Sequence, residues 1–276
     1  MAHAVVSFRF RGQLRCPNVT VKLFPVVRSA CMQKCAALFT LVLVLAMAVP
    51  AHADDKNDEY RFTVDPSYAL TDDHKWIGVG HLGYFKSDDN NYQTDYLGLG
   101  MVWRFAPWAE VWFGVNYYRT DNEIIADVEE WRPQVGFKNY FTQSGPFTFY
   151  NLARLEYRMR EFEGVEQETE SFRLRDRLGI VFALTEEQDR AGSWYGIADV
   201  EAFYNFESDT TDRVRLRTGL GVSLNDRVRV ELSYYAQFTD LGSGGLEWND
   251  NIYRINVKLA RQRGVLARLA HGDSDD

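Results

Sequence analysis

Alternation with a period of two runs through most of the chain after residue 60, and it constrains the fold more than any other feature. Between residues 211 and 224, apolar side chains and one threonine occupy every second position from Val214 to Leu224, and three arginines from Arg213 to Arg217 begin the opposite row. Such alternation is the mark of a β-strand with two different faces. The sequence predicts eleven such segments, at residues 60–70, 74–86, 93–105, 108–120, 127–141, 146–160, 171–184, 193–206, 211–224, 226–239 and 250–260.

The length of these segments and the residues at their ends favour a membrane barrel. A tilted strand crosses a bilayer with about 9–11 residues, and strands of soluble proteins are usually shorter, at about 5–6 residues. Aromatic residues such as Tyr60, Trp108, Tyr140 and Trp194 lie near many strand ends, as expected for interfacial girdles. We therefore expect an all-β, transmembrane antiparallel up-and-down β-barrel, with a periplasmic β-sandwich as the alternative.

The connections between the segments also differ in length. Those at 106–107, 142–145 and 225–226 are tight, whereas those at 87–92, 121–126, 161–170 and 240–249 are longer and polar. Short periplasmic turns and longer outer loops are typical of outer-membrane barrels.

The number of strands is expected to be even, because bacterial single-chain barrels have even strand numbers. A barrel that begins at residue 74 has ten strands. If 60–70 is also a wall strand, an even count requires one further strand that the eleven segments do not include, and the barrel has twelve strands. We expect ten to twelve strands and slightly favour twelve, because 60–70 alternates as clearly as its neighbours.

The first 53 residues are predicted to be removed. Met32-Gln33-Lys34 gives a positive start, residues 35–49 are apolar apart from one threonine, and Ala51 and Ala53 precede Asp54 in an A-x-A cleavage pattern. We interpret residues 32–53 as a signal peptide, and residues 1–31 either as a mis-called start or as a long n-region. The domains are then the removed segment 1–53, a barrel over 54–260 and a polar tail over 261–276.

Cleavage changes the composition of the chain that folds. All three cysteines lie at or before residue 35, so the mature chain has no disulfide and no cysteine ligand for zinc. Residues 1–53 carry six of the 31 Lys and Arg and none of the 39 Asp and Glu, so the net charge falls from −8 to −14. An acidic exported chain is a poor binder of nucleic acid.

Five stretches carry a resemblance to a known family: "VEEWRPQ" (128–134), "LARLEYRMREFE" (152–163), "FRLRDRLGIVFAL" (172–184), "RVRLRTGLGVSL" (213–224) and "RVRVELSYY" (227–235). With these, residues 60–260 resemble the domain-of-unknown-function 2490 family of Gram-negative outer-membrane proteins. The resemblance implies an outer-membrane β-barrel and no established activity. One departure is that strands of this type usually end the chain on an aromatic residue, whereas the last strand here ends near Leu259-Ala260 with residues 261–276 beyond it.

If the apolar rows face lipid, the charged rows face the lumen, where charges at membrane depth are tolerated. The predicted anion path consists of Arg154, Arg158, Arg173, Arg175, Arg177, Arg213, Arg215, Arg217, Arg227 and Arg229. Its predicted acidic partners are Glu130, Glu156, Asp199, Glu201 and Glu231. Either the arginines line a narrow channel for small anionic solutes, or the acids neutralise the arginines in the salt-bridged lumen of a closed structural or surface-binding barrel.

An outer-membrane acyl hydrolase is the less favoured alternative. His81, in the middle of a strand, has no serine within two positions, so the sequence predicts no catalytic, cofactor or metal site. The expected partners are outer-membrane lipid and lipopolysaccharide, the barrel-assembly machinery and a small anionic solute. Asp176 falls on a lipid-facing row, which is tolerable near the outer interface or at a local bulge.

Overall fold

The computed structural model describes residues 56–87, 91–123, 126–142, 146–164, 168–185, 191–240 and 245–260. The expected signal segment 1–53 and the expected tail 261–276 lie outside these residues. The strands are β1 (Asn57–Ala69), β2 (Trp76–Ser87), β3 (Tyr92–Ala106), β4 (Ala109–Asn122), β5 (Val128–Thr142), β6 (Phe147–Phe162), β7 (Glu168–Ala183), β8 (Ser193–Asn205), β9 (Thr210–Asn225), β10 (Val228–Asp240) and β11 (Leu246–Ala260).

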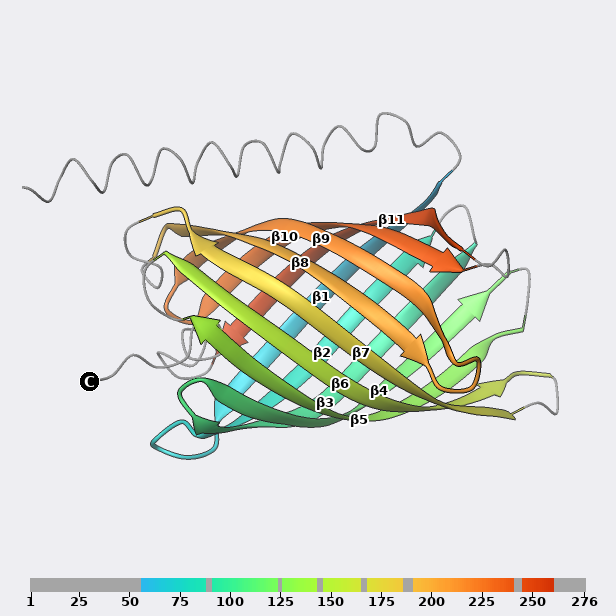
Figure 1. The fold of residues 1–276 in the computed structure, drawn as a ribbon, viewed down its shortest axis with the longest axis horizontal. Coiled ribbons are helices and arrows are strands. Elements are labelled where there is room, and N and C mark those ends of the chain that lie inside the picture. The colour runs from blue at the N-terminus through green and yellow to red at the C-terminus, as the bar shows by residue number, and fades with distance from the viewer. Residues whose placement is uncertain are drawn as a thin grey trace, which may run out of the picture.

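These strands form one closed barrel in which each strand pairs with its neighbours in the sequence (Figure 1). Consecutive strands are antiparallel, and β1 closes the barrel by pairing with β11 in parallel. The described part of the chain thus has eleven wall strands, so the favoured count of twelve is wrong. The predicted segments themselves are confirmed, including 60–70 as β1. A parallel closing pair is what an odd number of strands in an up-and-down barrel requires.

We call the end where β1 and β11 begin the N-end and the end where they finish the C-end. The N-end carries the connections 88–91, 123–127, 163–167, 206–209 and 241–245, and the C-end carries 70–75, 107–108, 143–146, 184–192 and 226–227. The tight connections are therefore at the C-end, as expected. The connection 184–192 shares that end and is longer than those at the N-end, so the predicted contrast in length is only partial.

The parallel seam between β1 and β11 is joined by side chains as well as by backbone. Thr63 Oγ1 donates to Asn256 Oδ1 at 3.0 Å, and Asn256 Nδ2 donates to Asp65 Oδ2 at 2.8 Å. Nearer the N-end, Asn251 Nδ2 donates to Asp58 Oδ1 at 2.9 Å. Parallel pairing is slightly weaker per residue than antiparallel pairing. These side-chain bonds add to the ladder at the seam.

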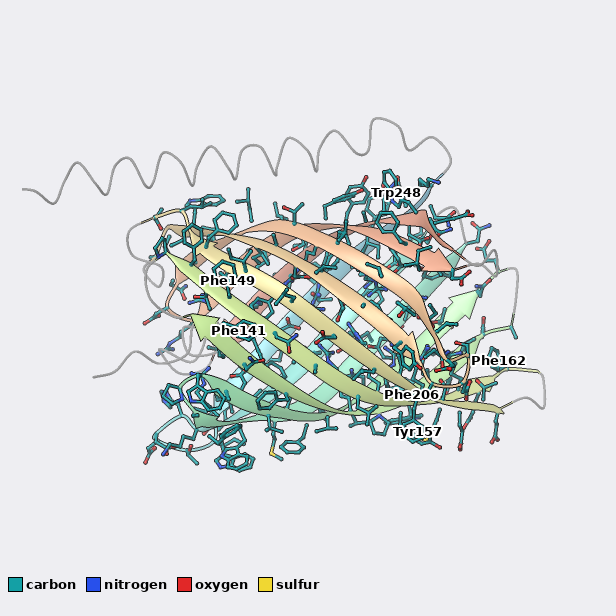
Figure 2. The ribbon with its side chains drawn as sticks, in the orientation of Figure 1. Phe141, Phe149, Tyr157, Phe162, Phe206 and Trp248 are labelled. Atoms are coloured by element: carbon teal, nitrogen blue, oxygen red, sulfur yellow. The ribbon has the colours of Figure 1, made fainter. Side chains whose placement is uncertain are left out.

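The outer surface has an aliphatic middle and aromatic ends. Leu99, Leu178, Leu216 and Leu232 are exposed there, with Leu99 at 62%. In Figure 2, Phe141 and Phe149 lie near one end of the barrel, and Tyr157 and Phe206 lie near the other. Of the aromatic residues predicted at strand ends, Tyr60, Trp108 and Trp194 are exposed there, whereas Tyr140 is buried inside the barrel and is not a girdle residue. In the part of the chain that the structure describes, no helix is long and apolar enough to cross a membrane.

Inward-facing glycines make room for inward-facing tyrosine rings. A Cβ at Gly221 would lie 2.2 Å from the Tyr195 ring, and one at Gly179 would lie 2.4 Å from the Tyr150 ring. The Tyr195 hydroxyl then donates to Glu231 at 2.8 Å. Glycine spacing along these strands therefore reflects packing inside a narrow lumen.

Asp176 faces outward near the middle of β7. The β6–β7 and β7–β8 ladders run through this position without a register shift, so there is no local bulge. Its partner is Asn151 of β6, whose Nδ2 donates to Asp176 Oδ1 at 2.7 Å. The position is therefore an exposed polar pair within the apolar outer surface.

Candidate functional site

The lumen contains a cavity of about 510 Å³ lined by a large excess of positive charge. Among the described residues, twelve arginines and two lysines line it, against five carboxylates. The basic residues are Arg61, Arg132, Lys138, Arg154, Arg158, Arg173, Arg175, Arg177, Arg213, Arg215, Arg217, Arg229, Arg254 and Lys258, and the acids are Glu59, Asp65, Glu130, Glu201 and Glu231. A chain that is acidic overall thus concentrates basic side chains inside its barrel.

Nine of the ten arginines predicted to face the lumen line this cavity. The exception is Arg227, which lies exposed in the 226–227 turn at the C-end, so its predicted lumen position is wrong. The alternating pattern continues through this two-residue turn, and β10 begins only at Val228. The pattern alone therefore placed Arg227 on the strand.

The predicted acids lie inside the barrel, at two depths. Glu130, Glu201 and Glu231 line the cavity, whereas Glu156 and Asp199 are covered by the arginines that bind them. Glu156 has no exposed side-chain surface and Asp199 has 2%. Carboxylates buried this deeply require paired cations and further hydrogen bonds.

A largely buried ladder of ion pairs crosses strands β6, β7 and β8. Glu156 accepts from Arg173 Nη2 at 2.5 Å and from Arg175 Nη1 at 2.7 Å. Arg175 Nη2 also donates to Glu201 Oε1 at 2.8 Å, and Arg177 Nη2 donates to Glu201 Oε2 at 2.9 Å. The three alternate arginines of β7 are thus held apart by acids from both neighbouring strands, as cross-strand pairing requires.

Two further acids extend this ladder towards the ends of the barrel. Arg158 donates to Glu130 through two nitrogens, at 2.5 and 3.0 Å. Asp199 accepts from Arg217 Nε at 2.6 Å and from the Tyr150 hydroxyl at 3.1 Å. Two-point contacts between guanidinium and carboxylate fix the geometry of both partners.

Four guanidinium groups surround one buried ring, Phe203 of β8. The distances from the ring centroid to the guanidinium carbons are 5.2 Å for Arg173, 4.7 Å for Arg175, 5.7 Å for Arg213 and 4.9 Å for Arg215. Phe203 is only 1% exposed. Cation–π contacts of this kind stabilise a guanidinium, but they do not neutralise its charge.

Three arginines of the lumen have no carboxylate within 4.0 Å among the described residues. Arg154 donates to the neutral Gln134 Oε1 at 3.3 Å, and Arg215 donates to the neutral Gln237 Oε1 at 2.5 Å. Arg213 has a buried Nε with no hydrogen-bond partner. The excess of positive charge is therefore concentrated on specific side chains.

The more exposed side chains of the lumen lie on the other side of the barrel, along β11, β1 and β2. Lys258 is 35% exposed and Arg254 is 25% exposed, although both side chains point inward. His81, 24% exposed, faces Asp65 with its Nδ1 at 2.9 Å and stacks on Tyr96 with the ring centroids 6.1 Å apart. Among the described residues, these contacts of His81 include no serine.

Part of the lumen is filled near the C-end. Ala69, Ile77, Val79, Val102 and Ala260 form an apolar cluster there with Trp112 packed against it. Beside this cluster, Glu110 is fully buried. Glu110 accepts from Trp112 Nε1 at 2.9 Å, from Arg104 Nη2 at 3.2 Å and from the Tyr140 hydroxyl at 3.2 Å.

This closure was not predicted, because it depends on which inward residues meet across the barrel. Part of it could have been predicted from the sequence. Arg104 and Glu110 lie on either side of the tight 107–108 turn, and this spacing makes them cross-strand partners. At the N-end the inward side chains Arg61, Tyr92, Thr120 and Arg160 are only half-buried. These side chains leave accessible surface at the N-end, as Lys258 does near the C-end.

The described residues contain no group of three or more His, Cys, Asp or Glu that could hold a metal ion. No curated protein matches the chain at a significant level. One solved structure, described as a bacterial polysaccharide outer membrane secretin, matches with 15% identity and a TM-score of 0.42, over 68% of this chain and 64% of that chain. The family model described as "Protein of unknown function (DUF2490)" matches residues 55–248, so the chain belongs to that family.

Proposed function

We propose that this protein is an outer-membrane β-barrel whose arginine-lined lumen admits and binds small anionic solutes. The membrane position is supported by the aliphatic middle and aromatic ends of the outer surface, which are typical of the apolar band and girdles of a bilayer-spanning barrel. The expected signal peptide with cleavage between Ala53 and Asp54 fits export to that membrane.

The excess of arginine and lysine over carboxylate around the cavity carries the proposal. A lumen that served only as a salt-bridged filling would balance its charges, because an uncompensated buried charge destabilises the folded state. Here the cavity lining includes Arg154, Arg213 and Arg215, which have no carboxylate within 4.0 Å among the described residues. Rings of arginine and lysine favour anions over cations.

A closed structural barrel is the second candidate, and the C-end supports it. The apolar cluster around Ile77 and Val102 and the buried Glu110 leave no exposed surface at these three side chains. Passage of a solute through the barrel would require this cluster to move. Binding from the N-end would not.

Planar-bilayer recordings of the reconstituted barrel test the proposal. We expect a small conductance in the wild type and a larger one in Ile77→Ala/Val102→Ala, because the double variant removes side-chain volume from the C-end. The reversal potential in a salt gradient should report anion selectivity in both. A matched control is Leu99→Ala/Leu232→Ala, which removes aliphatic side chains from the outer surface.

Two results would contradict the proposal. A folded Ile77→Ala/Val102→Ala barrel that conducts cations better than anions would overturn the anion preference. A folded barrel that neither conducts nor binds anions would favour the closed structural role.

A further inference from the structure

We call Phe203 and the four guanidinium groups around it the platform. The arginines of the platform fall into two halves, which differ in their electrostatic partners. On the β7 side, Arg173 and Arg175 contact the ring and also bind Glu156. On the β9 side, Arg213 and Arg215 contact the same ring, and among the described residues neither has a carboxylate within 4.0 Å, although Glu201 lies opposite Arg215 in the strand register. One half is therefore ion-paired with carboxylates and the other half is not.

Gln237 shows that the uncompensated half is built by the fold. The amide oxygen of Gln237 accepts from Arg215 Nε at 2.5 Å and fixes the direction of that guanidinium. Gln237 is itself 7% exposed, and its amide nitrogen Nε2 donates to Asp250 Oδ2. The side chain that meets Arg215 is thus a neutral amide, and the nearby acid Asp250 is bound to the far side of that amide.

Arg213 supplies the unused hydrogen-bond donor. Its Nε is buried and has no partner, and Asp212 and Asp250 act on it only from beyond ion-pair distance. Arg213 and Arg215 are two residues apart on β9, so their stems are about 7 Å apart on the same face of the strand. One group with several oxygens can lie between two guanidiniums at this spacing and accept from both.

We propose that Arg213 and Arg215, held against Phe203, form a discrete binding site for one oxyanion group, a carboxylate, sulfate or phosphate. The site rests on the proposed function and assigns it a place and a ligand class. The bound oxyanion supplies on the β9 side the negative charge that Glu156 supplies on the β7 side. A monatomic anion such as chloride lacks the several oxygens needed to accept from both arginines.

Calorimetric titration of the detergent-purified full chain tests this site, with inorganic phosphate and glucuronate as separate probes and chloride as the ionic-strength control. The test variant is Arg213→Gln/Arg215→Gln. The control variant, Arg119→Gln/Arg227→Gln, removes two exposed arginines outside the cavity and changes the net charge equally. We expect binding to weaken about a hundredfold or more in the test variant only, because the variant removes two charge-assisted bonds of about 1.5–3 kcal/mol each.

The two probes separate the possible sources of the oxyanion. Tighter binding of phosphate assigns the site to a phosphate group, and tighter binding of glucuronate assigns it to an organic carboxylate. Equal binding to the wild type and to Arg213→Gln/Arg215→Gln overturns this site but leaves anion uptake by the lumen standing. Absence of binding in the wild type overturns the site, and the bilayer recordings then decide the proposed function separately.

Stability without added oxyanion gives a second measurement. Because Arg213 and Arg215 have no acidic partner, the melting temperature of the double glutamine variant should equal or exceed that of the wild type in chloride. Phosphate or glucuronate should then raise the melting temperature of the wild type and not that of the variant. A variant that melts well below the wild type in chloride would show that these arginines are structural, and would overturn the proposal.

Discussion

Arg175 Nη1 lies 2.7 Å from Glu156 Oε1, and the same guanidinium reaches Glu201 on the other side of its strand. This arginine of β7 therefore joins β6 to β8 through side chains as well as through the backbone. Glu156 has no exposed side-chain surface, so its charge is balanced entirely within the protein. The ladder built on this pair joins β6, β7 and β8 through largely buried side chains.

Glu156→Gln should destabilise the barrel by about 3–5 kcal/mol, because removing one partner of a buried ion pair leaves the guanidiniums of Arg173 and Arg175 uncompensated. Urea unfolding of the reconstituted barrel measures the change in the free energy of unfolding. The folded fraction at each urea concentration is the fraction that resists denaturation in detergent. Glu161→Gln, an exposed position on the same strand, should have almost no effect. Equal effects of the two substitutions would show that the ladder adds nothing to stability.

The parallel seam can be tested by cross-linking, because Thr63 and Asn256 are register partners and their side chains are joined at 3.0 Å. In a background with the three native cysteines replaced by serine, Thr63→Cys/Asn256→Cys should react with a short thiol cross-linker and give a closed product of altered mobility. Thr63→Cys/Val257→Cys should react poorly, since a shift of one residue moves the second thiol to the outer face. The reverse preference would place β11 in a different register.

Much of the wall could be predicted from the sequence, because alternation records both faces of a strand at once. The predicted 193–206 and 211–224 differ from β8 and β9 by no more than one residue at either end. The strand number could not be obtained in this way. Closure depends on the pairing of β1 with β11, which lie far apart in the sequence, and the local pattern says nothing about that pairing.

The lumen was predictable as a set of charges but not as a set of pairs. Alternation places both Arg175 and Arg215 inward. Arg175 nevertheless has two carboxylate partners, whereas Arg215 donates to the neutral Gln237. That difference arises from how side chains meet across the registers of neighbouring strands. Arg215 lies opposite Glu201 as well as Gln237, but Glu201 accepts from Arg175 and Arg177 of β7 instead. The same dependence on register explains why the platform at Phe203 could not be identified from one strand alone.

Gly221→Ala should destabilise the barrel by about 1–3 kcal/mol, the usual effect of overpacking a well-packed interior. The added methyl would lie 2.2 Å from the Tyr195 ring and would displace the hydroxyl that donates to Glu231. Adding Tyr195→Ala to Gly221→Ala should remove the clash, so the effects of the two substitutions on the free energy of unfolding should not add. Gly245→Ala, where a methyl meets nothing within 4 Å, is the control.

Asp176 provides a test of the proposed membrane position. Its carboxylate faces outward near the middle of β7, where its hydrogen-bond partner is Asn151. Arginine or lysine on the lipid face at the bilayer midplane costs about 2–4 kcal/mol, and aspartate less, whereas a charge near the interface costs about 0–1 kcal/mol. Asp176→Asn keeps a side chain that can bond to Asn151 and removes the charge. It should therefore raise the free energy of unfolding in lipid vesicles by about 1 kcal/mol or more.

Asp95→Asn is the matched control, because Asp95 also faces outward but lies near the N-end of β3. If the barrel spans a bilayer with its aliphatic middle in the hydrocarbon, Asp95→Asn should change the free energy of unfolding far less than Asp176→Asn does. If the barrel is instead a water-soluble protein, both positions face solvent and the two substitutions should have equally small effects. Equal effects in lipid vesicles would therefore contradict the membrane position independently of any measurement on the lumen.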